Sequence, residues 1–265
     1  MEKVRVLSLG AGVQSSALLL MCDRGDVEPV DFAVFADVQA EPREVYEWLE
    51  KLKKAVKTEI VIATRGNIAS DVIDHFEGRL KRVGQPPFHA LRGGKKSMIR
   101  RHCTFEYKIA VVDKAIRERL KYEPRERMKH HIEMVMGISY DEMQRMREPQ
   151  EKWKTFSYPL IEKEMRRSNC IKYVEATGLG TPPRSACYFC PYKTNAEWKH
   201  LRDTDQESWD LAVEFDRKIR RSKTPGLTSE FFVHRDCKPL DQVDLRDGDE
   251  GQISMLDECE GMCGV

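Results

Sequence analysis

A glycine- and serine-rich stretch near the amino terminus has the composition of an anion-binding turn. It lies between residues 4–9, an apolar run that predicts a buried strand, and residues 15–22, which predict a helix. Glycine lets the backbone turn tightly, and the free N–H groups at a helix N-terminus hold phosphate. The stretch lacks the Gly-Lys-Ser/Thr of a Walker loop, and a tight turn without a ligand is the alternative. The candidate phosphate-binding residues are Ser8, Gly10, Gly12, Gln14, Ser15 and Ser16.

Acidic residues follow two further predicted strands, residues 31–36 and 132–138. Ligands of parallel α/β sheets lie beyond the carboxyl ends of the strands, so these acids should face the same crevice as the glycine-rich turn. Carboxylates there can hold Mg²⁺, and a neighbouring arginine can neutralise phosphate charge. The alternative for the later group is an ordinary helix start with acids in its first turn. The candidate residues are Asp37, Gly137, Asp141, Glu142 and Arg145.

A third group is Cys187 and Cys190, a Cys-x-x-Cys followed by proline. This spacing suits a zinc knuckle or an iron–sulfur site. One such pair supplies two ligands, whereas a closed tetrahedral site needs four, and Cys103 is the natural third. A redox dithiol and a structural zinc site are the alternatives. The predicted metal ligands are Cys103, Cys187 and Cys190, for a [4Fe–4S] cluster or for Zn²⁺.

The hydrophobic pattern predicts the elements that would position these groups. Strands alternate with helices in the order βαβαβ, which indicates an α/β fold with a doubly wound, mostly parallel sheet and right-handed crossovers. The strands are expected at residues 4–9, 31–36, 59–63 and 132–138, and the helices at 15–22, 43–56, 104–120 and 165–177, with a helical C-terminal section at 196–220. Residues 84–96 are expected to form a mobile loop. Residues 178–184 form a Gly/Pro linker, so we predict a core at 1–180 and a helical section at 181–265.

Composition narrows the class of protein. The chain has 265 residues, of which 40% are hydrophobic and 34% charged. No apolar run approaches the roughly 18 residues of a membrane span, and the amino terminus lacks a signal-peptide pattern. We therefore expect a cytoplasmic protein with reduced thiols and no membrane partner. Residues 79–129 hold sixteen Lys/Arg against five Asp/Glu, which suits an anionic ligand or a solvated helical face.

Residues 10–16 resemble the pyrophosphate loop of ATP pyrophosphatases, usually Ser-Gly-Gly-x-Asp-Ser-Ser. Gly12, Ser15 and Ser16 stand on the family residues. The chain departs from the pattern at Gly10, Ala11 and Gln14, where the family has Ser, Gly and Asp. The change to Gln14 removes a carboxylate that could have contacted magnesium.

Four later segments resemble motifs of phosphoadenosine phosphosulfate reductases, in the same order along the chain. Over most of residues 4–195, the sequence is thus similar to that superfamily, which implies an adenine nucleotide alpha-hydrolase-like fold. Phe35-Ala36-Asp37 with Glu41 resembles Asp-Thr-Gly-x-Glu, and Cys103 with Lys108 resembles Cys-x-x-x-x-Lys. Gly137 with Glu142 and Arg145 resembles Gly-x-x-x-x-Glu-x-x-Arg, and Tyr158-Pro159-Leu160 resembles Tyr-Pro-Leu.

The resemblance also implies roles for the cysteines. Related adenosine phosphosulfate reductases bind a [4Fe–4S] cluster through an adjacent Cys-Cys and a later Cys-x-x-Cys. Here His102-Cys103 replaces the adjacent pair, which leaves the fourth ligand open between His102, Cys170, an external group and the substrate. Sulfonucleotide reductases carry a nucleophilic cysteine on a C-terminal tail, and either Cys259 or Cys263 could be that thiol.

Together these features favour an ATP pyrophosphatase-type enzyme. With ATP and Mg²⁺ it would adenylate an acceptor, a tRNA or DNA among the candidates, and transfer sulfur to it from a donor or reductant protein. A sulfonucleotide reductase is the alternative within the same fold. A non-catalytic module that binds nucleotide or nucleic acid is the alternative of another class. Self-association into a homo-oligomer is left open.

Overall fold

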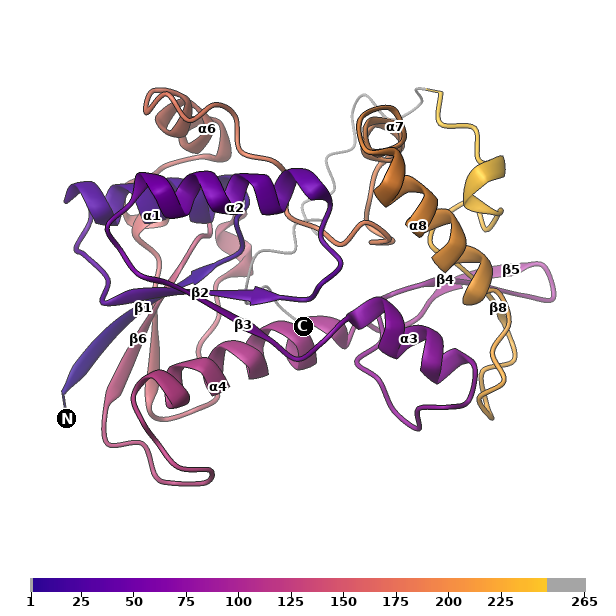
Figure 1. Cartoon of the computed structure of the whole chain (residues 1–265), viewed down its shortest axis with the longest axis horizontal. Coiled ribbons are helices and arrows are strands. Elements are labelled where there is room, and N and C mark those ends of the chain that lie inside the picture. The colour runs from indigo at the N-terminus through magenta and orange to yellow at the C-terminus, as the bar shows by residue number, and fades with distance from the viewer. Residues whose placement is uncertain (1, 247–265) are drawn as a thin grey trace.

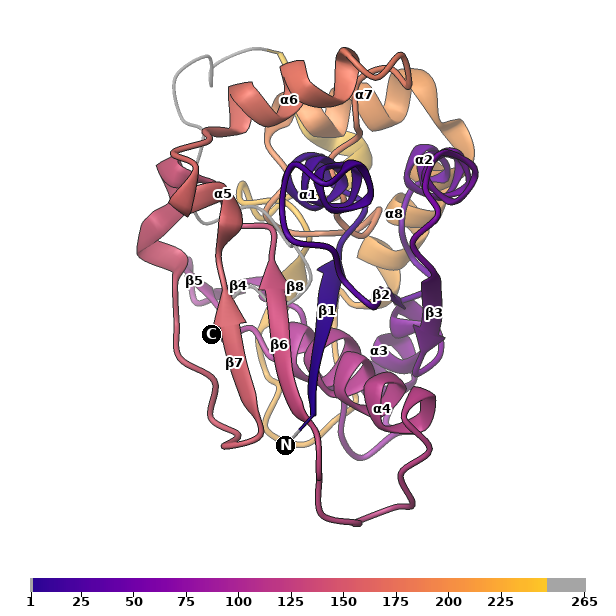
Figure 2. The same ribbon diagram turned by 90° about the vertical axis from the view of Figure 1, so that its left-hand side faces the viewer.

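A five-stranded, all-parallel sheet forms the centre of the protein in a computed structural model, which describes residues 2–246. The strand order is β3-β2-β1-β6-β7, and Figure 2 shows the strands side by side. β1, β2 and β6 are short and mostly apolar and buried, as expected for central strands covered on both faces. The predicted α/β class with a parallel sheet is therefore confirmed. The strands are β1 Lys3–Leu9, β2 Phe32–Asp37, β3 Ile60–Thr64, β6 His131–Met136 and β7 Lys154–Ser157.

Helices cover both faces of this sheet. In Figure 1, α1 and α2 lie above it and α4 lies below. In α2, Val45, Trp48, Leu49 and Leu52 are buried, and their spacing forms the apolar stripe of an amphipathic helix. Separate hydrophobic clusters fill the two faces, so the sheet is doubly covered. The helices are α1 Val13–Arg24, α2 Arg43–Ala55, α4 Ala110–Arg119, α5 Pro159–Glu162 and α6 Arg167–Glu175.

Apart from the clusters on the two faces of the sheet, a further hydrophobic cluster lies to one side of the sheet, at the right of Figure 1. We name it the second cluster. Its core includes aromatic rings in edge and stacked contacts, among them Phe76 against Phe231 and Phe189 against Phe215. It draws on residues both before and after the linker, and the boundary at residue 180 stays a prediction. Its elements are α3 Ile68–Phe76, α7 Asn195–Thr204, α8 Gln206–Lys218 and an antiparallel sheet of β4 His89–Arg92, β5 Lys95–Met98 and β8 Glu230–Phe232.

Hydrogen bonds join this second cluster to the segment that follows β2. The backbone N–H of Tyr188 donates to the carbonyl of Ala40 at 2.8 Å, and that of Ile68 donates to the carbonyl of Val38 at 3.1 Å. The carboxyl edge of the parallel sheet is therefore bordered by the Cys-x-x-Cys segment. Within residues 2–246, no helix combines the length and apolarity that a bilayer crossing requires.

Two of the predicted elements were wrong in detail. Residues 84–96 were expected to be a mobile loop, but they contain β4 and the start of β5, joined by a turn at Gly93 and Gly94 with φ of +55° and +76°. Glycine favours such positive φ values, which explains the sharp reversal. The single helix expected at 104–120 is a π-helical segment, Phe105–Ile109, followed by α4.

Candidate functional site

The strand order places a topological switch point between β1 and β6. From β1 the chain proceeds to β2 and β3 on one side, and it later adds β6 and β7 on the other. In such sheets the ligand crevice lies outside the carboxyl ends of the two strands at the switch. Residues 10–16 follow β1 and residues 137–142 follow β6. Two segments predicted as site residues from separate parts of the sequence thus meet at this position.

Side-chain hydrogen bonds from within the segment and from α2 hold residues 10–16, the predicted phosphate loop. Ala11 has a φ of +58°, which turns the chain sharply before α1 begins. The backbone N–H of Gly10 donates to Ser15 Oγ at 3.2 Å, and the indole Nε1 of Trp48 donates to Ser16 Oγ at 2.9 Å. In both bonds the serine oxygen is the acceptor, so each hydroxyl proton remains to be donated. Buried O–H donors and the first N–H groups of a helix are the kinds of group that can bind phosphate.

The segment after β6 packs directly against this loop. A Cβ added to Gly137 would lie 2.9 Å from the backbone N of Ser15 and 3.0 Å from its Cα. Any other residue at 137 would therefore push on the phosphate loop. Gly137 was predicted to bind cofactor, and the structure shows why only glycine fits there.

A polar network links the two segments through Gln14. Its Nε2 donates to Glu142 Oε2 at 3.1 Å across 128 residues of sequence, and its Oε1 accepts from Arg167 Nη1 at 3.1 Å. Arg145 Nη1 donates to the other oxygen of Glu142 at 2.6 Å. An aspartate at position 14, as in the related motif, would set one carboxylate near another. The neutral amide instead bonds to both a carboxylate and a guanidinium.

The remaining acids near the carboxyl edge have structural partners. Asp37 ends β2 and accepts hydrogen bonds from the backbone N–H of Gln39 at 2.7 Å and from Tyr46 Oη at 2.9 Å. Burial, and then the charge of Asp37, raise the pKa of Tyr46. Asp141 accepts from the backbone N–H of Arg167 at 3.1 Å, at the start of α6. Catalytic roles for Asp37 and Asp141 stay predictions.

A buried ion pair lies in the segments that follow β2 and precede α4. Lys108 Nζ is 3.5 Å from Glu41 Oε1, and the two side chains are 6% and 1% exposed. Glu41 Oε2 has no hydrogen-bond partner within the described part of the chain. The pair joins two of the segments that resemble the reductase motifs, and a buried carboxylate oxygen there is an acceptor for a ligand's donor group.

The cysteines lie close to the same edge but do not form a complete metal site. Cys103 and Cys187 both pack against the second hydrophobic cluster, and a turn joins Cys187 to Cys190. Among residues 2–246, no three His, Cys, Asp or Glu side chains are grouped so that they could hold a metal ion. The thiol donor set suits iron–sulfur or zinc chemistry. The cluster therefore stays a prediction.

The other cysteines divide between the core and the C-terminal segment. Cys22 and Cys170 are buried in the cluster beneath α1 and α6, and burial raises the pKa of the Cys22 thiol to about 11. This agrees with a small core residue rather than a nucleophile. Cys259 and Cys263, the predicted tail nucleophiles, lie outside the described residues.

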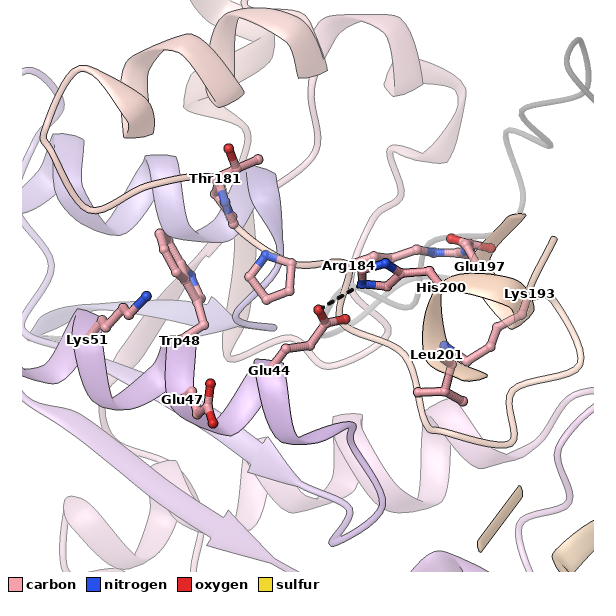
Figure 3. Close-up of a pocket in the computed structure, with 12 residues that line it drawn as sticks. Glu44, Glu47, Trp48, Lys51, Thr181, Arg184, Lys193, Glu197, His200 and Leu201 are labelled. Carbon is pink, nitrogen blue, oxygen red and sulfur yellow. Dashed lines mark hydrogen bonds and ion pairs between the residues drawn. The ribbon is translucent and has the colours of Figure 1, made fainter. Parts of the chain in front are cut away.

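A cavity of about 360 Å³ lies behind the phosphate loop, between α2, α7 and residues 181–184. Figure 3 shows Trp48 and Glu44 of α2 on one side and His200 of α7 on the other, with Glu44 Oε2 3.3 Å from His200 Nε2. Arg184 and Glu197 form a second ion pair at its rim. Trp48 both lines this cavity and bonds to Ser16, so it is the direct link between the cavity and the phosphate loop.

Sequence reasoning missed two residues that shape the site. Trp48 fits the apolar stripe of α2 and gave no sign that its indole N–H supports the loop. Arg167 opens α6 and contacts Gln14 across 153 residues of sequence, a distance at which no local pattern operates.

No protein-family model matches the chain, and a search of curated protein sequences likewise finds no match. What the structure defines is the class: an α/β protein with a five-stranded parallel sheet covered by helices on both faces.

Proposed function

We propose that this protein is an ATP pyrophosphatase-type enzyme of the adenine nucleotide alpha-hydrolase-like fold. The observation that carries the proposal is the meeting of residues 10–16 and 137–142 at the switch point, with Gly137 against Ser15. A loop of buried serines at a helix N-terminus, at the crevice of a parallel sheet, is suited to the phosphates of a nucleotide.

In this mechanism the phosphate loop holds the β- and γ-phosphates of ATP. Ser15 and Ser16 donate their hydroxyl protons to phosphate oxygens, and Arg145 neutralises charge that develops as pyrophosphate leaves. A substrate oxygen attacks the α-phosphorus, the bond to the β-phosphate oxygen breaks, and an adenylated acceptor forms. Catalysis is mainly positioning, because the reacting groups are fixed relative to one another. Mg²⁺, when bound, would be held through the carboxylate of Asp37 and would supply positive charge that offsets the charge of the phosphates.

The second half of the proposed reaction is sulfur transfer. The outer sulfur of a cysteine persulfide attacks the acceptor carbon, and the C–O bond to AMP breaks so that AMP leaves. A second thiol then cleaves the remaining S–S bond and frees the thiolated acceptor, with Cys103, Cys187 and Cys190 as the candidate thiols. Cys259 or Cys263 is the proposed reactive tail thiol, and a separate protein supplies sulfur or reducing equivalents. A tRNA or DNA acceptor, and a cytoplasmic location, belong to the same proposal.

Product analysis tests the proposal. With α-labelled ATP, the enzyme should release pyrophosphate and leave the label in AMP or in the acceptor. Release of ADP and phosphate would contradict the reaction type. Release of sulfite from a sulfonucleotide, without consumption of ATP, would establish the reductase alternative. Nucleotide binding without formation of any product would favour the alternative of a non-catalytic binding module.

A further inference from the structure

The longest stretch of one-signed charge in the chain lies on the β4–β5 hairpin and its flanks. From Gly78 to Thr104 the sequence holds eight Lys/Arg and no Asp/Glu. Arg79 and Arg82 are paired, with Asp74 and Glu106. Within residues 2–246, the structure shows no ion pair for five exposed cations of this stretch. They are Lys81, which precedes the hairpin, and Arg92, Lys95, Lys96 and Arg100, which lie on it or directly after it.

The hairpin geometry presents the hairpin cations together. The Gly93–Gly94 turn lets β4 and β5 run antiparallel, with Arg92 opposite Lys95. All four residues of β5 are exposed, and β5 is the edge strand of its sheet. Figure 1 shows the hairpin extending from the second cluster at the right of the molecule. Its charges therefore lie on an exposed edge of the sheet, where Lys96 Nζ also donates to the carbonyl oxygen of Arg235 at 3.5 Å.

A groove of about 760 Å³ runs beside the hairpin, between its turn and residues 221–230. Arg92 lines one wall, and Thr228 and Ser229 bring hydroxyl groups to the other. Arg221 on that wall is already paired with Glu230. Hydroxyls and guanidinium groups are the usual donors to phosphate oxygens in protein–nucleic acid contacts.

Aromatic side chains lie where the hairpin leads back toward the crevice. Phe105 is 52% exposed, and it opens the π-helical segment that carries Lys108, the buried partner of Glu41. Nearby, the Arg101 guanidinium lies over the ring of Tyr192 at 5.6 Å. An exposed ring that follows a cationic hairpin in the chain offers a face on which an unpaired base can stack.

We propose that this surface binds a single-stranded nucleic acid. The hairpin cations contact its phosphates, and a base stacks on Phe105, which directs the strand toward the crevice. The proposal rests on the proposed function for the chemistry at the crevice, and it names the acceptor as nucleic acid. A single strand is favoured over a duplex because a ring can stack only on a base that has left its own stack.

The test is binding of a labelled oligonucleotide of about 20 residues, measured by fluorescence anisotropy from about 50 to 200 mM salt. RNA, DNA and duplex of one sequence are compared. The double variant Lys95→Gln/Lys96→Gln should bind the single strands about tenfold more weakly and lower the salt slope by about 1.4, the value for two lost contacts. The matched control Lys54→Gln/Lys57→Gln, with the same charge change beside α2, should bind as the wild type does.

A second variant tests the stacking. Phe105→Ala should weaken binding about tenfold, as loss of one stacked base does, and Phe105→Tyr should restore it. Equal affinity for duplex and single strand, or equal losses in the control, would overturn the proposal. If the hairpin lysines serve only to block edge pairing, the double variant aggregates and binding is unchanged. Tighter binding of RNA than of DNA would identify the single strand as RNA.

ATP titration of the same variants separates the two proposals. If ATP binds normally and no oligonucleotide binds, the hairpin proposal fails and the proposed function stands. If oligonucleotides bind and ATP does not, the proposed function fails and the hairpin proposal stands.

Discussion

The crevice at the switch point and the surface around the cysteines and the hairpin differ in how far their chemical groups are assembled. At the crevice, Ser15, Ser16, Gln14 and Glu142 are buried and joined by hydrogen bonds to one another or to supporting residues. Around the hairpin, the cations are exposed, and the three thiols do not form a metal-binding group within residues 2–246.

This difference separates two tasks. Groups that must hold a small anion in one geometry are preorganised by burial, because a fixed donor costs no reordering when the ligand binds. Groups that meet a large or variable partner can stay exposed and acquire their order on binding. We therefore expect substitutions at the crevice to abolish function sharply, and substitutions on the other surface to act more gradually.

The largest effect is expected at the phosphate loop. Gly12 has φ of −91° and ψ of −170°, a backbone that any residue adopts, so Gly12→Val puts no strain on the main chain, and circular dichroism checks that the variant is folded. Its branched side chain would occupy the position of a phosphate and weaken ATP binding by about 100-fold or more, which corresponds to roughly 3 kcal/mol. Calorimetric titration measures this. Affinity equal to the wild type would remove the loop from the site.

The next effect concerns metal. If the thiols bind a cluster, anaerobically purified protein should contain iron and sulfide, and Cys187→Ala should lose both along with activity while ATP affinity is kept. Cys22→Ala is the control, since Cys22 is buried in a different hydrophobic cluster. Elemental analysis gives the result. Zinc without iron would indicate a structural zinc site. Retention of metal in Cys187→Ala would exclude Cys187 as a metal ligand.

The two regions should also differ in their response to acid, through His234. This side chain donates from Nε2 to Asn195, and its Nδ1 accepts from the backbone N–H of Asp236, so the ring is neutral. Burial lowers the pKa of His234 from 6.5 to about 4. The unfolded chain then binds a proton that the folded chain does not, and stability falls as pH drops from 6.5 toward 4.

The loss attributable to His234 is at most about 3 kcal/mol, at 1.36 kcal/mol per unit of pKa. Urea unfolding at a series of pH values measures it, with His234→Gln as the variant that keeps a donor to Asn195. The variant should flatten the acid limb of the profile. An unchanged profile would show that other groups control acid stability.

The smallest effect is expected from Trp48→Phe. This change keeps most of the packing of α2 and removes the hydrogen bond to Ser16. A net loss of about 1 kcal/mol in stability is expected, with a few-fold loss of ATP affinity. Comparison with His200→Ala, across the cavity, tests whether Trp48 transmits changes from there. Full ATP affinity in Trp48→Phe would show that the loop does not need this support.

Much of the sheet could be predicted because its strands are apolar runs followed by turn residues. β1, β2, β3 and β6 each lie within two residues of the predicted bounds. β7, Lys154–Ser157, was missed because its sequence has only one large apolar residue and carries a buried lysine, which Asp113 and Glu151 neutralise. The hairpin was missed because four-residue strands rich in lysine show no alternation of apolar residues.

The site was predicted from local motifs and completed by long-range contacts. Gly12, Ser15, Ser16 and Gly137 stand in short patterns with a physical meaning, so the sequence could offer them as candidates. The supporting bonds from Trp48 and Arg167 depend on how α2 and α6 pack over the sheet, and that packing is set by tertiary structure. The partner of Gln14 could not be read from the sequence for the same reason.

The most direct test of the central claim is hydrogen–deuterium exchange with and without ATP. If ATP binds at the switch point, amides of residues 10–16 and 137–142 should exchange more slowly when it is present, because the phosphates bind the N–H groups at the start of α1. Exchange on the hairpin, β4 and β5, should be unchanged. Protection confined to α2, α7 and residues 181–184 would place the nucleotide in the cavity behind the loop and would contradict the account.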